Sequence, residues 1–229
     1  MGQREIKVSA HIINKEKIMN QSTTKGKGSY KDLLNRGFKK CTLEIEKDSK
    51  KNLFSALASP KTLKECLTRK RYQKNKAKAE NSYKTYLNEP LPHFLDTLKK
   101  SKDDFYKEFL NPNGDDIFCQ FTLKEESVKK QKGLYSYCVD GKIVYIGRCR
   151  DNFGKRINNG YGHISPKNCY LDGQSTNCHV NSLVHKNRNK ISFYVLSMTK
   201  NNEIEQEEKD LIALFDPEWN KILKLKKTK

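Results

Sequence analysis

A hairpin signal near the middle of the chain constrains the fold most. Asp140-Gly141 is the strongest short-range signal for a tight β-turn, and apolar and polar residues roughly alternate around it from Ser136 to Val144. The sequence therefore predicts two short antiparallel strands. They carry the triplets Gly133-Leu134-Tyr135 and Tyr145-Ile146-Gly147.

The length of the turn decides which face of the hairpin each tyrosine occupies, because a one-residue change in pairing moves a side chain to the opposite face. A two-residue loop, Asp140-Gly141, would place Tyr135 and Tyr145 on opposite faces. A three-residue loop, Val139-Asp140-Gly141 with the glycine left-handed, would set both tyrosines across from each other. We prefer the longer loop, which makes the two phenols a candidate reactive surface on a glycine-flanked hairpin. An ordinary aromatic cross-strand pair is the alternative.

The charge balance points to a polyanionic partner. The 229-residue chain has 46 Lys and Arg against 27 Asp and Glu, a formal net charge of +19. Such an excess is typical of proteins that bind nucleic acid, although it also keeps a protein soluble. A chain of this length has room for one large or two small domains.

The cysteines indicate a reducing compartment. Seven cysteines without regular spacing, and no apolar N-terminal segment, predict free thiols in the cytoplasm. No run of about 18 apolar residues occurs, so we expect no membrane-spanning segment. A zinc site is not expected either, because no C-x-x-C spacing occurs among the candidate ligands Cys149, Cys169, Cys178, His179 and His185.

The first half of the chain is expected to begin with strands. Alternating apolar residues predict half-buried strands over 6–12 and 41–45, with a flexible, basic loop over 21–30. The run 111–116 is dense in turn residues, and we place a domain boundary there. The boundary divides the chain into a basic N-terminal DNA-binding region and a second domain, 1–115 and 116–229.

Helices are expected in the rest of the N-terminal region. Ser59-Pro60 is a typical helix start, and the helical pattern continues toward Leu87. Residues 94–109 predict a second helix with an apolar face. In the first helix, cations far outnumber acids and tyrosines interleave with them, which suits phosphates and bases; a solvated helix face is the alternative. The cations that we assign to DNA contact, one of them from the second domain, are Arg69, Lys70, Arg71, Lys74, Lys76 and Arg148.

Short elements are expected to follow the hairpin. Asp151 can cap a short helix that ends at Gly160, and Ser175 or Thr176 can begin another. Residues 174–181, full of small amides and hydroxyls, are a candidate for contacting DNA or ordering water, with helix capping as the alternative. A strand is predicted over 191–197.

The final predicted helix, from about Asn202 to Phe215, places one carboxylate on its apolar side. At about 100° per residue, Glu208 falls in the middle of the stripe formed by Ile204, Leu211, Ile212 and Phe215. Because desolvating a lone carboxylate costs several kcal/mol, Glu208 must be paired, protonated or bound to a metal. An ion pair with a Lys or Arg of the preceding helix and a metal site both remain open.

Four sequence blocks in order resemble one known family. The blocks are Gly133-Leu134-Tyr135, Tyr145-Ile146-Gly147, Phe153-Gly154-Lys155-Arg156, and Glu208-Lys209-Asp210-Leu211-Ile212 followed by Pro217 and Asn220. Each block alone is a weak motif, but the ordered set resembles the GIY-YIG nuclease family. The resemblance covers roughly residues 130–222, about the size of a small domain, and says nothing about the first half.

The resemblance implies an α+β fold in which a GIY-YIG module, a small three-stranded antiparallel sheet flanked by helices, follows the mainly helical basic N-terminal region. It also implies cleavage of DNA phosphodiesters with one divalent cation, Mg²⁺ or Mn²⁺, per active site. By position, Tyr135 would activate or orient the attacking water, Tyr145 would line the same pocket, and Arg156 would bind the scissile phosphate. Glu208 would hold the metal, and Asn220 would brace the site. This set supplies the water, Lewis acid and cation that phosphodiester hydrolysis needs.

Two positions depart from the family's pattern. The spacing from Gly147 to Arg156 is one residue longer than is common, so Lys155 is a second candidate for the phosphate role. Many members carry a His or Tyr one turn after the arginine, where this chain has Gly160, with Tyr161 and His163 slightly later. Since a phenol with a pKa near 10 is a poor base at pH 7, the groups expected to lower that pKa or accept the proton are Lys155, Arg156, His163 and Tyr161.

The sequence thus predicts a sequence-specific double-stranded DNA endonuclease of the type II restriction kind, part of a restriction-modification system. One active site per chain would favour a homodimer for cutting both strands. A homing or DNA-repair nuclease on the same module is the nearest alternative, although neither a long linker nor a zinc-finger pattern is evident. A hypothesis from another class is a non-catalytic nucleic-acid-binding protein in which the tyrosines and Glu208 are structural.

Overall fold

The computed structural model describes residues 28–58 and 60–220. Its strands are β1 (Lys39–Cys41), β2 (Leu43–Lys50), β3 (Phe118–Leu123), β4 (Gly133–Val139), β5 (Lys142–Cys149) and β6 (Ile191–Ser197). Its α-helices are α2 (Tyr30–Asn35), α3 (Leu63–Leu67), α4 (Lys76–Ser82), α5 (Leu91–Lys100), α6 (Glu126–Lys129), α7 (Ser175–Lys186) and α8 (Asn201–Phe215). The tighter helical turns are η1 (Leu53–Ala56), η2 (Lys70–Asn75), η3 (Lys84–Tyr86), η4 (Asp104–Phe109) and η6 (Pro166–Cys169), and η5 (Gly154–Tyr161) is a π-helix.

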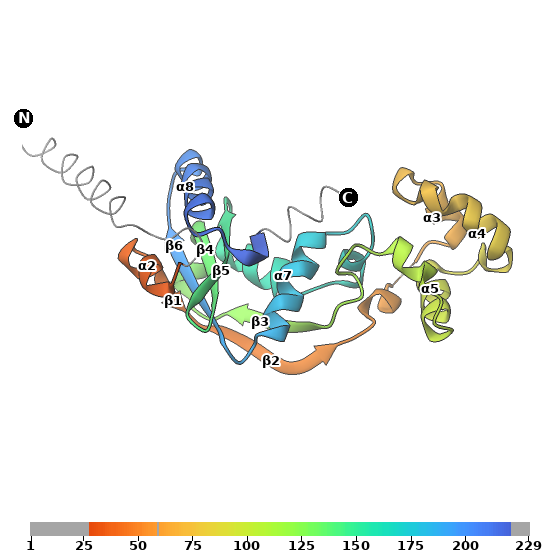
Figure 1. Ribbon diagram of the computed structural model, residues 1–229, viewed down its shortest axis with the longest axis horizontal. Coiled ribbons are helices and arrows are strands. Elements are labelled where there is room, and N and C mark those ends of the chain that lie inside the picture. The colour runs from red at the N-terminus through yellow and green to blue at the C-terminus, as the bar shows by residue number, and fades with distance from the viewer. Residues whose placement is uncertain (1–27, 59, 221–229) are drawn as a thin grey trace, which may run out of the picture.

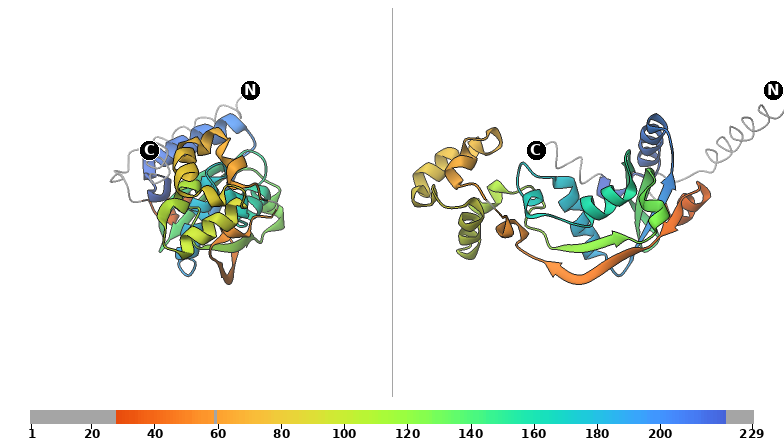
Figure 2. Two further views of the ribbon diagram at one scale, coloured as in Figure 1. Left: turned by 90° about the vertical axis from the view of Figure 1, so that its right-hand side faces the viewer. Right: turned by 180° about the vertical axis from the view of Figure 1, so that it is seen from behind.

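The molecule is elongated, with helices α3, α4 and α5 at one end and the main sheet with α2 and α8 at the other (Figure 1). Helix α7 lies between the two ends, and β2 and β3 run side by side along one flank, as the view from behind also shows (Figure 2). The strand predicted over 6–12, and the predicted loop 21–30 as far as residue 27, lie outside the described residues. None of the helices in the described ranges has both the length and the apolar character needed to cross a membrane.

The main sheet has four antiparallel strands in the order β1-β6-β4-β5, so the expectation of three strands is wrong by one. The fourth strand comes from the N-terminal half, where β1 pairs along the edge of β6 with Lys40 opposite Tyr194. A second sheet joins β2 to β3, with Ile45 opposite Phe121. The mixed α+β class is confirmed. Both pairings cross residue 115, and the functional division there stays a prediction.

The predicted hairpin is confirmed, but its turn is the shorter of the two alternatives. Val139 pairs with Lys142, and Asp140 and Gly141 have φ values of 48° and 80°, as a two-residue turn with two left-handed positions requires. The register then shifts, because Cys138 pairs with Ile143 whereas Tyr137 pairs with Tyr145. Val144 is therefore the extra residue of a β-bulge.

This bulge places the tyrosines on one face. Beyond it Tyr135 lies opposite Gly147, and the ring centres of Tyr135 and Tyr145 are 6.2 Å apart. Without the bulge, the two-residue turn would have put these rings on opposite sides of the sheet. The shared face was predicted correctly, and the three-residue loop given as its cause was wrong.

The helix predicted from Pro60 toward Leu87 is instead a series of short helical pieces. On one ideal helix, Leu63 and Leu67 would lie roughly 160° from Tyr72 and Tyr83, so one apolar face would have remained exposed. The chain avoids this by becoming extended at Arg69 (φ −81°, ψ 137°), which separates α3 from η2. All the apolar positions then face one core, which η6 and the start of α7 complete.

Two helix starts differ from the prediction. Helix α3 begins after Thr62, which exchanges hydrogen bonds with Glu65 in a capping box, and not at Ser59-Pro60. After the hairpin, Asn152, not Asp151, caps η5, because its Oδ1 accepts the backbone N–H three residues later at 2.7 Å. The helix continues beyond Gly160. The predicted starts of α7 and β6 are confirmed, and α8 agrees to within one residue.

The main sheet carries a core on each face. Tyr135, Tyr137 and Phe193 pack toward η5, α7 and β3, whereas Leu134 and Ile146 pack toward α2 and α8. Strand β5 forms the edge of the sheet opposite β1, and α8 packs beside it. The phenols of one face and the carboxylate of α8 can therefore meet only around this edge.

Candidate active site

Three phenols and one guanidinium form a buried hydrogen-bond network. Strand β4 supplies Tyr135, β5 supplies Tyr145, and η5 supplies Arg156 and Tyr161. The Tyr161 hydroxyl oxygen lies 2.9 Å from that of Tyr135 and 3.2 Å from that of Tyr145. Arg156 donates from Nη2 to Tyr161 at 2.7 Å and from Nε to Tyr135 at 3.2 Å. Tyr161 is thus the centre of the network.

The π-helical geometry of η5 explains why Tyr161 takes this place. Its hydrogen bonds span five residues, as from the Gly162 N–H to the Ile157 carbonyl at 2.6 Å. An α-turn from Arg156 would have led to Gly160, the position that the sequence pattern marked. The longer turn brings Tyr161 there instead, with the guanidinium carbon 4.6 Å from the centre of its ring.

Gly147 lets the Tyr135 hydroxyl reach the edge of the sheet. A Cβ atom at this position would lie 2.5 Å from that hydroxyl oxygen and 2.6 Å from the ring carbon that carries it. A larger residue would therefore displace the phenol from the network. The second glycine of the hairpin motif is explained by this close approach.

Glu208 forms an ion pair with Arg148 of the edge strand β5. Its Oε2 lies 2.6 Å from Arg148 Nη1, and the Glu208 side chain is 16% exposed. Arg148 also lies 3.9 Å from Glu205, which pairs with Arg150 as well. The inward position of Glu208 is confirmed, and its partner comes from β5 and not from the preceding helix. The backbone N–H of Arg148 also hydrogen-bonds to this carboxylate and opposes a rise in its pKa.

The side chain of Asn220 hydrogen-bonds to the backbone of the edge strand β5. Its Oδ1 accepts the N–H of Ile146 at 3.0 Å, and its Nδ2 donates to the Ile146 carbonyl at 2.8 Å. The N–H and C=O of Ile146 point away from β4. The Asn220 amide therefore satisfies backbone groups that no further strand pairs with at this edge. Asn220 lies where a brace for the site was expected.

Lys155 and His163 lie outside the network. The Lys155 ammonium is exposed and pairs with Asp151 at 2.8 Å, so Arg156 alone approaches the phenols. His163 is also exposed, and no hydrogen bond or ion pair links it to the described part of the site. The expectation that either residue serves the phenols is therefore not met by this geometry.

Burial keeps the phenols protonated. It raises the pKa of Tyr135 and Tyr161 well above the ordinary value of 10, and that of Tyr145 is raised for the same reason. Burial also raises the pKa of Glu208 from its ordinary 4.5, against the opposing effect of Arg148. The phenols are therefore suited to holding a water or a phosphate by hydrogen bonds, and a neutral Tyr135 does not itself remove a proton.

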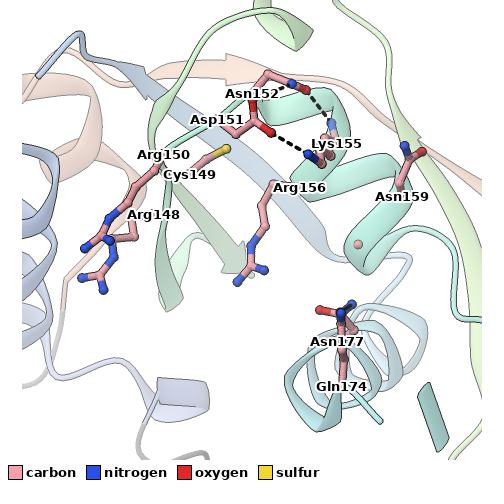
Figure 3. Close-up of a pocket in the computed structure, with 11 residues that line it drawn as sticks. Arg148, Cys149, Arg150, Asp151, Asn152, Lys155, Arg156, Asn159, Gln174 and Asn177 are labelled. Carbon is pink, nitrogen blue, oxygen red and sulfur yellow. Dashed lines mark hydrogen bonds and ion pairs between the residues drawn. The ribbon is translucent and has the colours of Figure 1, made fainter. Parts of the chain in front are cut away.

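Two adjoining hollows open on these groups. The smaller, about 310 Å³, is lined by Tyr135, Tyr145, Arg148, Arg150, Arg156 and Glu208. The larger, about 450 Å³, shares the three arginines and extends over η5 to the start of α7 (Figure 3). Three guanidiniums beside one carboxylate favour an anionic ligand.

The basic segment of the N-terminal region is partly paired. Arg69 lies 2.8 Å from Asp172, Lys74 lies 2.6 Å from Glu108, and Lys76 lies 3.8 Å from Glu80. Arg71 donates to the carbonyl of Leu171 at 2.7 Å, and Lys70 is exposed. Surface ion pairs of this kind are weak, so they do not prevent phosphate contact.

The tyrosines of that segment are not stacking faces. Tyr72 is buried and donates to Asp172 at 2.7 Å, and Tyr83 donates to Asp103 while its ring stacks on Phe105 at 5.0 Å. They hold the helical region together. The expectation that they interleave with cations to bind bases is therefore wrong for these two residues.

Asn181, the last residue of the segment 174–181 that was expected to contact DNA or order water, is instead a buried positioning residue. It is fully buried, and its Nδ2 donates to the carbonyls of Tyr161 and Cys119 at 2.6 and 2.7 Å. Its Oδ1 accepts the Cys119 N–H at 3.0 Å. This one amide fixes the end of η5, and with it Tyr161, against α7 and β3.

No protein-family model matches the chain, and no curated protein or solved structure matches it either. All seven cysteines are free and buried. Within residues 28–58 and 60–220, no three or more His, Cys, Asp and Glu side chains lie close enough together to hold a metal ion among them. The chemistry of the site therefore has to be argued from its own geometry.

Proposed function

We propose that the protein is a metal-dependent endonuclease that hydrolyses phosphodiester bonds of double-stranded DNA, of the sequence-specific, type II restriction kind. The observation that carries the proposal is the convergence of Tyr135, Tyr145, Arg156 and Glu208, from four separate elements, on one hollow. The ordered motifs that resemble GIY-YIG nucleases contain all four residues. The net charge of +19 and the three shared arginines suit a DNA backbone.

The arrangement assigns a task to each group. The Arg156 guanidinium uses Nε and one Nη to fix the phenols, and its remaining Nη can bind the scissile phosphate and offset the charge that develops there. Neutral phenols at Tyr135 and Tyr145 orient the attacking water by hydrogen bonds. Asn220 holds the edge strand that carries Tyr145 and Arg148.

The donor set fits a divalent cation that is shared with substrate. Mg²⁺ commonly binds through one or two carboxylates together with substrate phosphates and water. Glu208 is the one carboxylate of the smaller hollow, and the Arg148 guanidinium contacts its Oε2. Glu208 would hold the ion, which would act as a Lewis acid on a phosphate oxygen.

A non-catalytic DNA-binding protein is the second candidate, and the Arg148–Glu208 ion pair favours it. A carboxylate at 2.6 Å from a guanidinium is already neutralised. On this interpretation the phenol network is structural, and the arginines bind phosphates without cleaving them.

Plasmid digestion with Mg²⁺ separates the two candidates. We expect discrete fragments from the wild-type protein, and loss of cleavage with near-intact binding for Tyr135→Phe and Glu208→Ala. A Gln206→Ala variant, which removes an exposed amide of α8, is the control. Retardation without cleavage by the wild-type protein would favour the binder, and nicking of branched DNA would favour repair.

A second test has a readout besides cleavage. Arg148→Ala leaves Glu208 without its partner, so a metal ligand there should let Mg²⁺ raise the melting temperature by mass action. The double variant Arg148→Ala/Glu208→Gln should show no such rise. Equal responses of the two variants to Mg²⁺ would overturn the metal assignment.

A further inference from the structure

The larger hollow beside the candidate active site has no task in the proposed chemistry. It shares Arg148, Arg150 and Arg156 with the smaller hollow, so a nucleotide next to a phosphate on these cations would lie at its mouth. In Figure 3 the Arg156 guanidinium lies between Arg148 and Arg150 on one side and Gln174 and Asn177, at the start of α7, on the other. The far wall thus carries neutral amides and not further cations.

The two amides hold each other in place. Asn177 Nδ2 donates to Gln174 Oε1 at 2.5 Å, and Asn177 is 4% exposed. Neither side chain makes another hydrogen bond within residues 28–58 and 60–220. The bond leaves the Gln174 NH₂ as a donor and the Asn177 carbonyl as an acceptor. Reversing both amides would again leave one NH₂ and one carbonyl, so the pair always offers a donor beside an acceptor.

Adenine is the base whose major-groove edge matches this pattern. Its N7 accepts and its N6 donates, whereas guanine presents two acceptors, cytosine a donor, and thymine an acceptor beside a methyl group. An Asn or Gln amide binds adenine in this bidentate way in many complexes. A fixed pair of amides at the wall of a groove, beside phosphate-binding cations, therefore suits the reading of one base.

We infer that Gln174 and Asn177 read an adenine in the nucleotide adjacent to the phosphate bound by Arg156. The inference rests on the proposed DNA cleavage, for which it names a specificity-determining pair.

Selection of bound duplexes from a random-sequence library, in EDTA, tests this without cleavage. The wild-type protein is expected to enrich an A·T pair at one position. Gln174→Ala should weaken that preference about tenfold at that position alone. Gln174→Glu keeps an acceptor for Asn177 and turns a second acceptor toward the base, so the preference should move to the N4 donor of cytosine. Gln206→Ala should retain the wild-type preference.

Two outcomes would overturn the inference. One is an unchanged preference in Gln174→Ala, and the other is a wild-type protein that selects no base at any position. Because Gln174 is exposed, its variants should keep the wild-type circular dichroism spectrum, which excludes misfolding as the cause of a changed preference. Failure to cut plasmid DNA would refute the nuclease proposal and leave this binding result intact, so the two failures are distinguishable.

Discussion

Replacing Tyr161 or Tyr137 by phenylalanine should change the stability of the protein in opposite directions, although both tyrosines lie in the same core. The Tyr161 hydroxyl has three partners, Tyr135, Tyr145 and Arg156, at 2.7–3.2 Å. The Tyr137 hydroxyl is equally buried, yet none of the described residues gives it a hydrogen bond. Replacing each tyrosine by phenylalanine therefore makes the same chemical change in opposite hydrogen-bonding states.

The magnitudes follow from these partners. Tyr161→Phe removes a charge-assisted bond worth roughly 1.5–3 kcal/mol and also the one hydrogen bond that the Tyr145 hydroxyl makes within the described residues, so we expect a loss of about 2–4 kcal/mol in the free energy of unfolding. Tyr137→Phe removes a hydroxyl that is desolvated without compensation, so we expect a gain of about 1 kcal/mol. At about 2–4 °C per kcal/mol, the melting temperature should fall by roughly 4–16 °C in the first variant and rise by a few degrees in the second.

Urea titration followed by circular dichroism measures both values. The single tryptophan, Trp219, lies 6.1 Å from Tyr137 between ring centres, and its fluorescence is a second probe of the same transition. The slope of the unfolding free energy against urea should stay unchanged in both variants. A Tyr137→Phe protein that is less stable by more than about 1 kcal/mol, or a Tyr161→Phe protein as stable as the wild type, would refute the reasoning.

Three further predictions concern the site and its approaches. Because burial raises the pKa of Glu208 above 4.5 and a metal needs the charged carboxylate, cleavage should increase with pH through that raised pKa; an acid limb of kcat/KM at or below pH 4.5 would contradict this. Asn220→Ala removes both hydrogen bonds to Ile146, so stability should fall by about 1–3 kcal/mol, and the amide of Ile146 should show faster hydrogen exchange; unchanged exchange would exclude the brace. Lys70→Ala combined with Arg71→Ala should weaken DNA binding for all sequences and reduce the slope of log K against log [salt] by about 0.9 per lost phosphate contact, which fluorescence anisotropy over a salt series would show.

The hairpin, β6 and α8 could be predicted because their signals are local. The Asp140-Gly141 turn, the β-branched run of β6 and the apolar stripe of α8 each depend on neighbours within a few residues. The bulge at Val144 could not be predicted in this way. It satisfies both cores at once, since Ile143 faces α8 while Val144 and Tyr145 face η5, and neither core is visible in the hairpin sequence.

The position of Tyr161 opposite Arg156 could not be predicted from the sequence for a related reason. Counting residues along an α-helix marks Gly160, and only the π-helix, with one more residue per turn, brings Tyr161 opposite Arg156. What holds the longer turn is the Asn181 amide on the Tyr161 carbonyl, a contact between residues 20 positions apart. Long-range hydrogen bonds of this kind override the helical period that sequence patterns report.

Glu208 of α8 shows that two interpretations of a carboxylate, an ion pair and a metal ligand, can both hold although they look exclusive in the sequence. An ion pair and a metal site were the two ways to stabilise an inward carboxylate, but a carboxylate has two oxygens and the Arg148 guanidinium contacts one of them. Arg148, the partner of Glu208, also lines both hollows, so a phosphate bound there can neutralise part of the Arg148 charge. Anion binding at Arg148 and cation binding at Glu208 then favour each other. A phosphate on Arg148 weakens the hold of Arg148 on Glu208 and so frees the carboxylate for a cation, and a cation on Glu208 likewise frees Arg148 for a phosphate. An ion pair that is neutral when the site is empty, and whose members can bind a phosphate and a cation together, is what a shared donor set requires.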